Sequence, residues 1–217
     1  MSSGVIEKLL DVLYPRGLVC ASCGREAVVD ENGLCEDCAG GLELYNAAPP
    51  IKNIFDCTAA YVYNDVSGRM VKKLKYGGKT YLAQTLADAI TLPEDWKIDA
   101  VVPVPLHKNR VRRRGFNQSE LIAEALCKRC GLELRPELLS RSADTVQQAG
   151  LSGAARRRML KEAFTGSEDC RGLSVLLVDD VRTTGTTLAC CAAELVKCGC
   201  ARVYAATVCY AKDDRNV

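Results

Sequence analysis

The groups in this 217-residue chain best suited to chemistry are two adjacent acids followed closely by threonines. Asp179 and Asp180 come first, and then four hydroxyl donors and a glycine: Thr183, Thr184, Gly185, Thr186 and Thr187. Hydroxyl groups around a glycine suit a phosphate, because glycine lets the backbone curl closely about the anion. Two adjacent carboxylates would repel a bare phosphate, so we expect them to contact hydroxyl groups or a hydrated magnesium ion. A ribose 5-phosphate with free hydroxyls satisfies both requirements.

The segments on either side of these residues predict a strand and a helix. Val175–Val178 is a run of branched aliphatic residues bounded by charge, which is typical of a strand buried on both faces, and Thr186–Cys198 has a helical pattern. The polar stretch is then the turn between them. In an open α/β sheet, ligands bind beyond the carboxyl ends of the strands, where the first N–H groups of the next helix carry partial positive charge. The sequence therefore predicts an anion site at this turn.

Strands and helices alternate along most of the chain. Strand patterns cover residues 55–63, 100–104, 173–178 and 202–208, and helical patterns cover residues 66–76, 81–90, 119–130 and 186–198. The first strand pattern could also form half of a hairpin. Regular alternation predicts an α/β fold with a doubly wound parallel sheet.

Four of the thirteen cysteines have the spacing of a metal site. The pairs Cys20/Cys23 and Cys35/Cys38 each enclose two residues and are eleven residues apart, so two thiolate pairs can close a tetrahedron around one Zn²⁺. Cysteine supplies every ligand and no coordination position stays open, so we expect a structural zinc. Free thiols in a surface loop are the alternative, disfavoured because so short and polar a segment has no core of its own. We expect the other cysteines to act as small hydrophobic residues.

Two parts are expected from these patterns. Residues 1–48 would form an amino-terminal helix, from the helical spacing of Val5–Leu13, plus the zinc ribbon. Residues 51–217 would form the α/β domain, joined through the linker-like Ala47–Pro50.

Composition excludes few function classes. Lys and Arg total 29 against 27 acids, and this balance does not by itself imply a nucleic-acid partner. No stretch approaches the roughly 20 apolar residues of a membrane span. The first residues lack a basic amino-terminal region, so we expect no signal peptide and a cytoplasmic protein.

Two features follow the strand pattern of residues 100–104. His107 is the chain's one histidine, and it could be a general base or a loop histidine that orders the neighbouring prolines or contacts phosphate. The second reading is favoured because no acid adjoins it in sequence. The basic run, Lys108–Arg114, holds five cations in seven residues. Because Gly115 and Asn117 follow, we expect a mobile loop that can close over a diphosphate. Two alternatives are a path for single-stranded nucleic acid, with Phe116 or Tyr76 stacking on bases, and a solvated surface.

These motifs also carry a family resemblance. Val175–Thr187 resembles the phosphoribosyl pyrophosphate (PRPP) motif of type I phosphoribosyltransferases. Val101–His107, Arg114–Gln118, Leu74–Tyr76 and the series between Thr145 and Phe164 resemble the ComF/GntX branch, the competence-type phosphoribosyltransferase-like proteins, which also carry a cysteine module. The likeness runs in order from about Cys20 to Val208, with Met159 at a position where the family usually has asparagine.

The resemblance implies PRPP as the ligand, Mg²⁺ as its companion and a link with competence and with uptake or processing of DNA. Asp179 and Asp180 would serve catalysis below the ribose, and Thr183–Thr187 would hold the 5-phosphate. Pro103, Val104 and Arg114 would face the pyrophosphate. Two functions stay open. One is Mg²⁺-dependent transfer of a phosphoribosyl group to an unidentified acceptor. The other is a non-catalytic PRPP sensor or single-stranded-DNA-binding protein that works with other DNA-uptake proteins.

Overall fold

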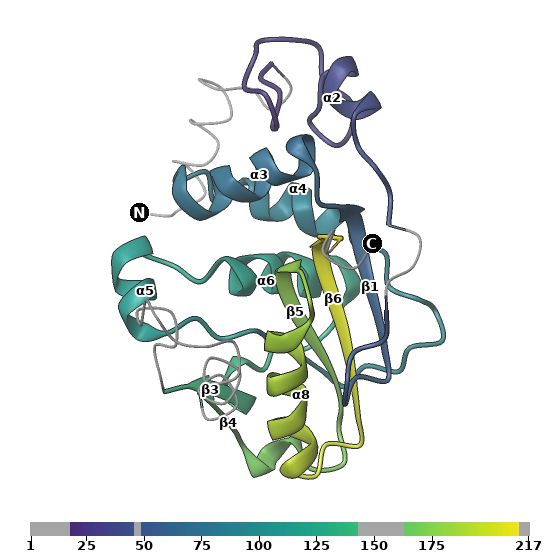
Figure 1. Ribbon diagram of the computed structural model, residues 1–217, viewed down its shortest axis with the longest axis vertical. Helices are drawn as coiled ribbons and strands as arrows, with labels where there is room; N and C mark the ends of the chain where they lie inside the picture. The colour runs from purple at the N-terminus through teal and green to yellow at the C-terminus, as the bar shows by residue number, and fades with distance from the viewer. Residues whose placement is uncertain (1–17, 46–48, 143–162, 213–217) are drawn as a thin grey trace.

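A four-stranded parallel sheet forms the centre of the computed structural model, which describes residues 18–45, 49–142 and 163–212 (Figure 1). Its spatial order is β1-β6-β5-β2, and every neighbouring pair is parallel. The strands are β1 (Asp56–Val62), β2 (Ala100–Pro103), β5 (Ser174–Arg182) and β6 (Arg202–Tyr210). A separate antiparallel pair joins β3 (Leu139–Arg141) to β4 (Phe164–Gly166), near the short 3₁₀ turns Pro136–Leu138 and Glu168–Cys170.

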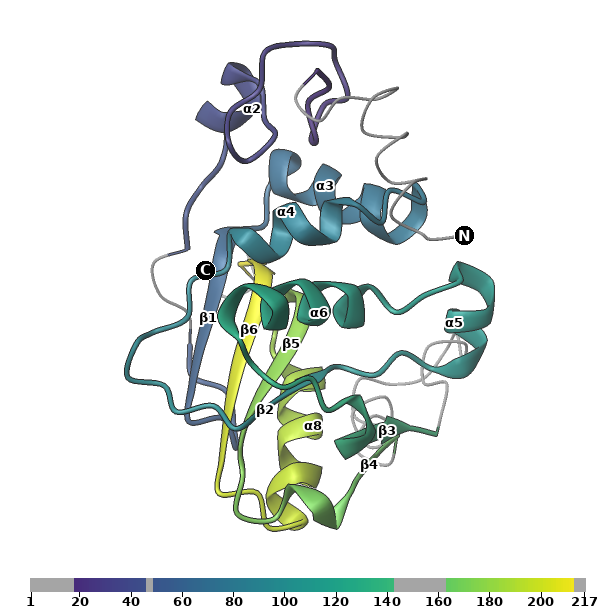
Figure 2. The same ribbon diagram turned by 180° about the vertical axis from the view of Figure 1, so that it is seen from behind.

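Helices cover both faces of the sheet. The long helix α8 (Thr186–Lys197) lies in front of it in Figure 1. The reverse view in Figure 2 brings α6 (Gln118–Cys130) forward, with α4 (Leu82–Asp88) and α3 (Asp65–Tyr76) above it in the picture. Alternate side chains of a strand point to opposite faces, so Leu176 packs with the α3/α4/α6 layer and Leu177 with α8. The predicted doubly wound α/β sheet is confirmed.

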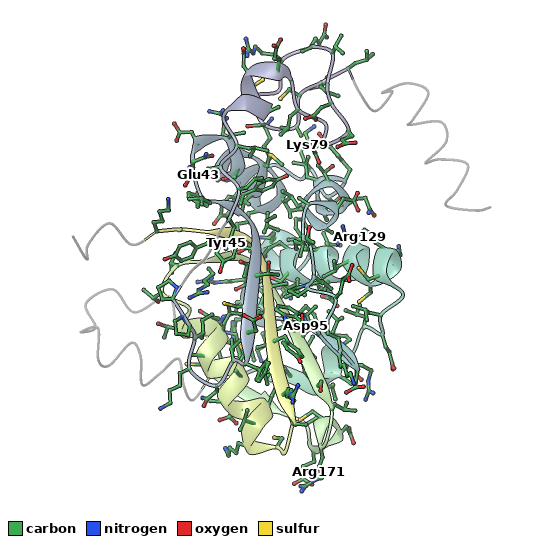
Figure 3. All side chains as sticks on the ribbon, turned by 90° about the vertical axis from the view of Figure 1, so that its right-hand side faces the viewer. Glu43, Tyr45, Lys79, Asp95, Arg129 and Arg171 are labelled. Carbon is green, nitrogen blue, oxygen red and sulfur yellow. The ribbon has the colours of Figure 1, made fainter. Side chains whose placement is uncertain are left out.

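Hydrogen bonds join two helices of the α3/α4/α6 layer. Arg129, labelled in Figure 3 at the end of α6, donates to the carbonyl oxygen of Asp88 at 2.6 Å and also to that of Ile90. The carbonyl groups at the end of α4 and just after it thereby gain charged donors, and α4 and α6 are fixed against each other.

The first strand pairs in parallel with β6 from the far end of the chain along one edge, and along its other edge a short antiparallel bridge joins Leu44 to Tyr61, so within the described residues the hairpin alternative is met only by this isolated bridge. The chain cannot turn straight back after Val62, since Asn64 begins α3 there. Its side chain accepts from the N–H groups of Val66 and Ser67, a capping box that starts a helix where a hairpin turn would be needed.

Strand β5 is longer than its apolar run predicts. It continues through the acidic pair, Asp179 and Asp180, to Arg182, because β6 keeps pairing with it, with Asp179 opposite Thr207 and Arg182 opposite Tyr210. The acidic pair therefore belongs to the strand, and the turn into α8 is short.

The expectation of a mobile loop at the basic run is wrong, because these residues form helix α5 (Lys108–Arg114). His107 caps its start, with Nδ1 accepting from the N–H of Asn109 at 3.3 Å. Three arginines in the last turn suit the negative end of the helix dipole, and Gly115, with φ of 91°, ends the helix in the left-handed region. Gly115 and Asn117 end one helix and begin the next, so they do not prevent a helix.

The residues around the four cysteines form a cap on α3, which we call the cysteine head (residues 18–42); it includes α2 (Glu36–Gly40) (Figure 1). The Ser22 hydroxyl donates to the carbonyl oxygen of Val66 at 3.0 Å, and the Lys73 ammonium donates to that of Ala21 at 3.2 Å. The predicted helix Val5–Leu13 lies outside the described residues. In the part of the chain that is described, no helix is long and apolar enough to cross a membrane.

Candidate functional site

The acidic pair lies near the carboxyl end of β5, where helices from elsewhere in the chain meet it. Asp179 Oδ1 accepts from the Ser119 hydroxyl at 2.8 Å and from the N–H of Asp180 at 2.9 Å. Asp180 is buried, and its Oδ2 lies 2.8 Å from the ammonium of Lys75. The first turn of α6 and the last turn of α3 therefore converge on the two carboxylates.

The two carboxyl groups differ in their surroundings. Asp179 keeps some solvent exposure, but the packing around its carboxyl group is close enough that burial raises its pKa. The neighbouring Asp180 carboxylate raises the pKa further, the Ser119 hydroxyl and Lys75 act in the opposite direction, and the net result is a pKa of about 7. Near neutral pH, Asp179 is thus present in both protonation states.

The threonine loop, Thr183–Thr187, leads from β5 into α8. Gly185 is the residue before the helix, with φ of 76°, and a Cβ added there would lie 3.0 Å from Ile51 Cγ1. Glycine is required both for the left-handed backbone and for the close approach of Ile51. Gly185 has no side chain to cap α8, and the Thr186 N–H makes a long bond of 3.4 Å to Thr184 Oγ1, so the following N–H groups of the first turn remain available to an anion.

The hydroxyl groups of the threonine loop lie at the surface. Thr183 and Thr184 are exposed, Thr186 and Thr187 are partly exposed, and the hydroxyl oxygens of Thr184 and Thr186 lie 2.8 Å apart. A pocket of about 440 Å³ opens beside the loop, with the segment Pro50–Asn53 as its other wall. Its size suits a small ligand. Pro50–Asn53 could not be assigned to this wall from sequence, since loop residues carry no pattern that reports what they face.

Arg182 lies buried behind the threonine loop, with one guanidinium nitrogen donating to Cys57 Sγ at 2.9 Å and another to the carbonyl oxygen of Pro49. Its guanidinium also sits 5.3 Å from the ring centre of Tyr210. A Cβ on Gly185 would lie 3.5 Å from Arg182 Nε. This arginine places a positive charge beneath the loop and holds the chain before β1 against the end of β5, a role that the sequence analysis missed.

Pro103 and Val104 are buried at the carboxyl end of β2, beside Val178. The Val104 N–H donates to the Val178 carbonyl oxygen at 2.9 Å, and the Val104 carbonyl accepts from the Asn117 side chain at 3.1 Å. Proline has no N–H, so neither residue offers a free donor while these bonds persist. Their contact with PRPP stays a prediction. No cis peptide bond occurs within the described ranges.

Arg114 reaches toward α3 from the end of α5. Its guanidinium lies 5.1 Å from the ring centre of Tyr76 and donates to the Gln118 side chain. Tyr76 follows Lys75 in the chain, so the structure brings Arg114 to the same helix end that contacts Asp180. The contacts of Lys75 and Ser119 with the acidic pair were also missed. The motif Leu74–Tyr76 pointed to this region but not to its partner.

The four cysteine sulfurs lie within 4.8 Å of one another, and Cys23 Sγ is 3.8 Å from Cys35 Sγ. Zinc–sulfur bonds of about 2.3 Å in a tetrahedron place sulfurs about 3.8 Å apart, so the cluster is compatible with a structural zinc. The Arg25 guanidinium, 3.4 Å from Cys23 Sγ, lowers the pKa of Cys23 to about 6. Burial raises the pKa of Cys38 to about 11, so a metal ion is needed to hold that sulfur as a thiolate at neutral pH.

Comparison with known proteins agrees with this geometry. Residues 111–217 match the phosphoribosyl transferase domain family. The DNA utilization protein YhgH of Salmonella typhi is 31% identical over 212 residues, covering 88% of this chain and 89% of the relative. Competence protein F of Haemophilus influenzae is 28% identical, with coverage of 78% and 86%. Competence protein ComFC of Bacillus subtilis is 27% identical, with coverage of 79% and 69%. The chain, with its phosphoribosyl transferase domain, therefore belongs to the family of these DNA utilization and competence proteins.

Proposed function

We propose that this protein binds PRPP with Mg²⁺ and transfers its phosphoribosyl group to an acceptor in the handling of DNA. One observation carries the proposal. The acidic pair lies near the carboxyl end of an inner strand that leads into a glycine-centred threonine loop, at a helix start whose N-cap residue is glycine. That combination offers donors to a phosphate and acceptors to sugar hydroxyls within one short segment.

Each part has a role in this proposal. The threonine loop binds the 5-phosphate through its backbone N–H and hydroxyl groups. Its residues are Thr183, Thr184, Gly185, Thr186 and Thr187. Asp179 and Asp180 accept from the ribose hydroxyls and stabilise positive charge on the ring as pyrophosphate leaves. Pro103 and Val104 line the pyrophosphate side, and Arg114 supplies a planar cation to it.

Asp179 is better placed than Asp180 to contact a hydrated Mg²⁺ ion. Asp179 is partly exposed and can reach a hydrated ion, whereas Asp180 is buried against Lys75. Magnesium keeps several waters and is commonly held by one or two carboxylates plus substrate phosphates. When bound, Mg²⁺ would neutralise charge on the departing pyrophosphate.

The experiment that tests the proposal follows pyrophosphate release. Protein, Mg²⁺ and PRPP are incubated with candidate bases, nucleotides and oligonucleotides, and PRPP binding is measured by calorimetry in parallel. The matched control changes Asp179→Asn and Asp180→Asn together, which keeps side-chain size and removes both charges. PRPP binding should be lost in that variant. Equal PRPP affinity in the two proteins would place the ligand elsewhere.

A second candidate function is non-catalytic, namely PRPP sensing or single-stranded DNA binding. The names of the relatives support a link with DNA, and helix α5 presents exposed cations, including Lys108, Arg112 and Arg113. Binding of PRPP without pyrophosphate release, for every acceptor tried, would favour this function over transfer.

The cysteine head has a structural role in either case. We propose one Zn²⁺ held by Cys20, Cys23, Cys35 and Cys38, in a module of residues 1–48 joined to a phosphoribosyltransferase-like domain of residues 51–217. Support comes from the sulfur geometry and from hydrogen bonds to the sulfurs, such as that from the N–H of Cys35 to Cys20 Sγ at 3.4 Å.

A further inference from the structure

The ion pair between Lys75 and Asp180 is the least exposed one recorded among the described residues, with side-chain exposures of 21% and 5%. Asp180 Oδ2 has almost no solvent-accessible surface, and no donor points at it with hydrogen-bond geometry. The ammonium lies 2.8 Å away, so the contact is a charge pair that leaves acceptor capacity on the oxygen unused. Lys75 thus covers the buried half of the acidic pair.

The lysine is delivered by an element outside the acidic strand and its loop. Helix α3 is fixed along its length by the cysteine head, through Ser22 and Lys73, and its last residue, Tyr76, carries the guanidinium of Arg114 against its ring. Lys75 lies between these two attachments. The backbone that carries Lys75 is therefore held on both sides, so the helix directs this lysine toward Asp180.

The charge of the site changes with this contact. The two carboxylates in their ionised form carry −2, and Lys75 reduces the cluster to −1. Divalent-ion affinity rises with the number of charged ligands, and Asp180 Oδ2 is no longer open to a metal. Asp179 Oδ1 already accepts two hydrogen bonds. Two of the four carboxylate oxygens, Asp179 Oδ1 and Asp180 Oδ2, are thus already engaged, which weakens the site for a free divalent ion.

We propose that Lys75 is a built-in counter-cation that occupies the cation position of the acidic pair. Free divalent metal consequently does not bind the unliganded protein. This part of the inference rests on the proposed function: Mg²⁺ binds only together with the diphosphate of the ligand. The diphosphate oxygens supply the coordination that the two carboxylates do not provide. The lysine takes over part of the charge neutralisation that a second metal ion would otherwise provide.

The test uses Mn²⁺ alone as the probe, with the free aqueous ion followed by electron paramagnetic resonance in full-length, zinc-loaded protein. Wild type should show no Mn²⁺ site that depends on Asp180. Lys75→Met should gain one Mn²⁺ per chain, with affinity tightened at least about tenfold, because a full charge beside the carboxylates is removed. Adding Asp180→Asn to that variant should abolish the gain.

Two matched controls isolate the position and the charge. Lys72→Met removes the same charge from an exposed position of the same helix and should behave as wild type. Lys75→Arg keeps the charge and should also bind no Mn²⁺. Thermal melting confirms that each variant is folded, and Lys75→Gln replaces Lys75→Met if the latter does not fold.

Two results would overturn the inference. One is an Asp180-dependent Mn²⁺ site in wild type as tight as in Lys75→Met. The other is a folded Lys75→Met, or Lys75→Gln, that gains no site. Calorimetry of PRPP with Mg²⁺ on wild type separates this inference from the proposed function: absence of PRPP binding refutes the proposed function, while the Mn²⁺ results still decide the role of Lys75.

Discussion

Ser119, at the start of α6, donates its hydroxyl to Asp179 Oδ1 at 2.8 Å, across 60 positions of sequence. The serine is almost fully buried, so the bond is sheltered from water. It opposes the effect of burial on the Asp179 carboxyl group but does not cancel it, because the pKa still rises to about 7. The ionised acidic pair is thus maintained at a cost to the stability of the folded state.

Asp179→Asn should stabilise the fold at pH 8. The folded-state pKa of about 7 lies above the ordinary 3.8, so between about pH 4 and 7 the folded protein binds more protons than the unfolded chain. The free energy of unfolding therefore falls as pH rises through that window. Asparagine carries no charge and removes this loss, so the free energy of unfolding at pH 8 should rise by on the order of 2 kcal/mol. Urea unfolding at pH 5 and pH 8 without Mg²⁺ measures it. A variant less stable than wild type at pH 8 would contradict the argument.

Gly185→Ala should distort the threonine loop. The left-handed backbone and the 3.0 Å approach of Ile51 both oppose a Cβ, so we expect a loss of about 1–2 kcal/mol in the free energy of unfolding. PRPP binding should weaken at least about tenfold, as for a displaced contact worth about 1.4 kcal/mol. Gly131→Ala is the control, since Gly131 has φ of 67° with open space around it. If both variants weaken PRPP binding equally, the loop is not the ligand site.

Cys38→Ser should release zinc and loosen the cysteine head. Elemental analysis of wild type is expected to give one zinc per chain, and the variant much less, because a four-thiolate site rarely tolerates loss of a ligand. Limited proteolysis within residues 18–42 should become faster. Cys130→Ser, at an exposed position outside the cluster, should change neither property. Wild-type protein purified without chelators that contains no zinc would rule the site out.

Arg112 and Arg113, changed to Ala, should weaken binding of single-stranded DNA more than binding of PRPP. Both side chains are exposed on α5, whereas Arg114 is held against Tyr76, the residue after Lys75. Each lost phosphate contact should flatten the salt dependence by roughly 0.7 in log–log slope. Arg114→Ala should show the reverse preference. Fluorescence anisotropy with an oligonucleotide and calorimetry with PRPP compare them, and unchanged affinities in all variants would identify a solvated surface.

Features of the site that lie within a few consecutive residues could be predicted from the sequence, whereas contacts between residues far apart in the chain could not. The β5–loop–α8 junction was predictable, because an apolar run, two acids and a glycine among threonines lie within 13 consecutive residues. The contact of Lys75 with Asp180 was not, because nothing local relates residues 105 positions apart, the difference of 180 and 75. The same holds for Arg182 and Pro49.

Helix α5 shows a different limit. Five cations and a following glycine suggested a loop, but the capping of its first turn by His107 and the dipole at its last turn outweigh repulsion among exposed side chains. The composition of the segment alone did not show that helix capping and the dipole outweigh the repulsion among its cations. In contrast, the alternation of strands and helices was strong enough to predict a doubly wound parallel sheet, because the apolar residues of inner strands must be buried on both faces, although the place of the first strand stayed open.

The attachment of the cysteine head to α3 has a thermodynamic consequence. The helix whose Val66 carbonyl oxygen accepts a hydrogen bond from Ser22 also carries Lys75 in its last turn, so the cysteine cluster and the acidic pair share one rigid element. If metal in the head strengthens ligand binding by some factor, the ligand must strengthen metal retention by the same factor, because the coupling is reciprocal. A chelator should then strip zinc more slowly from protein saturated with ligand, and the metal would report on occupancy of a site it never touches.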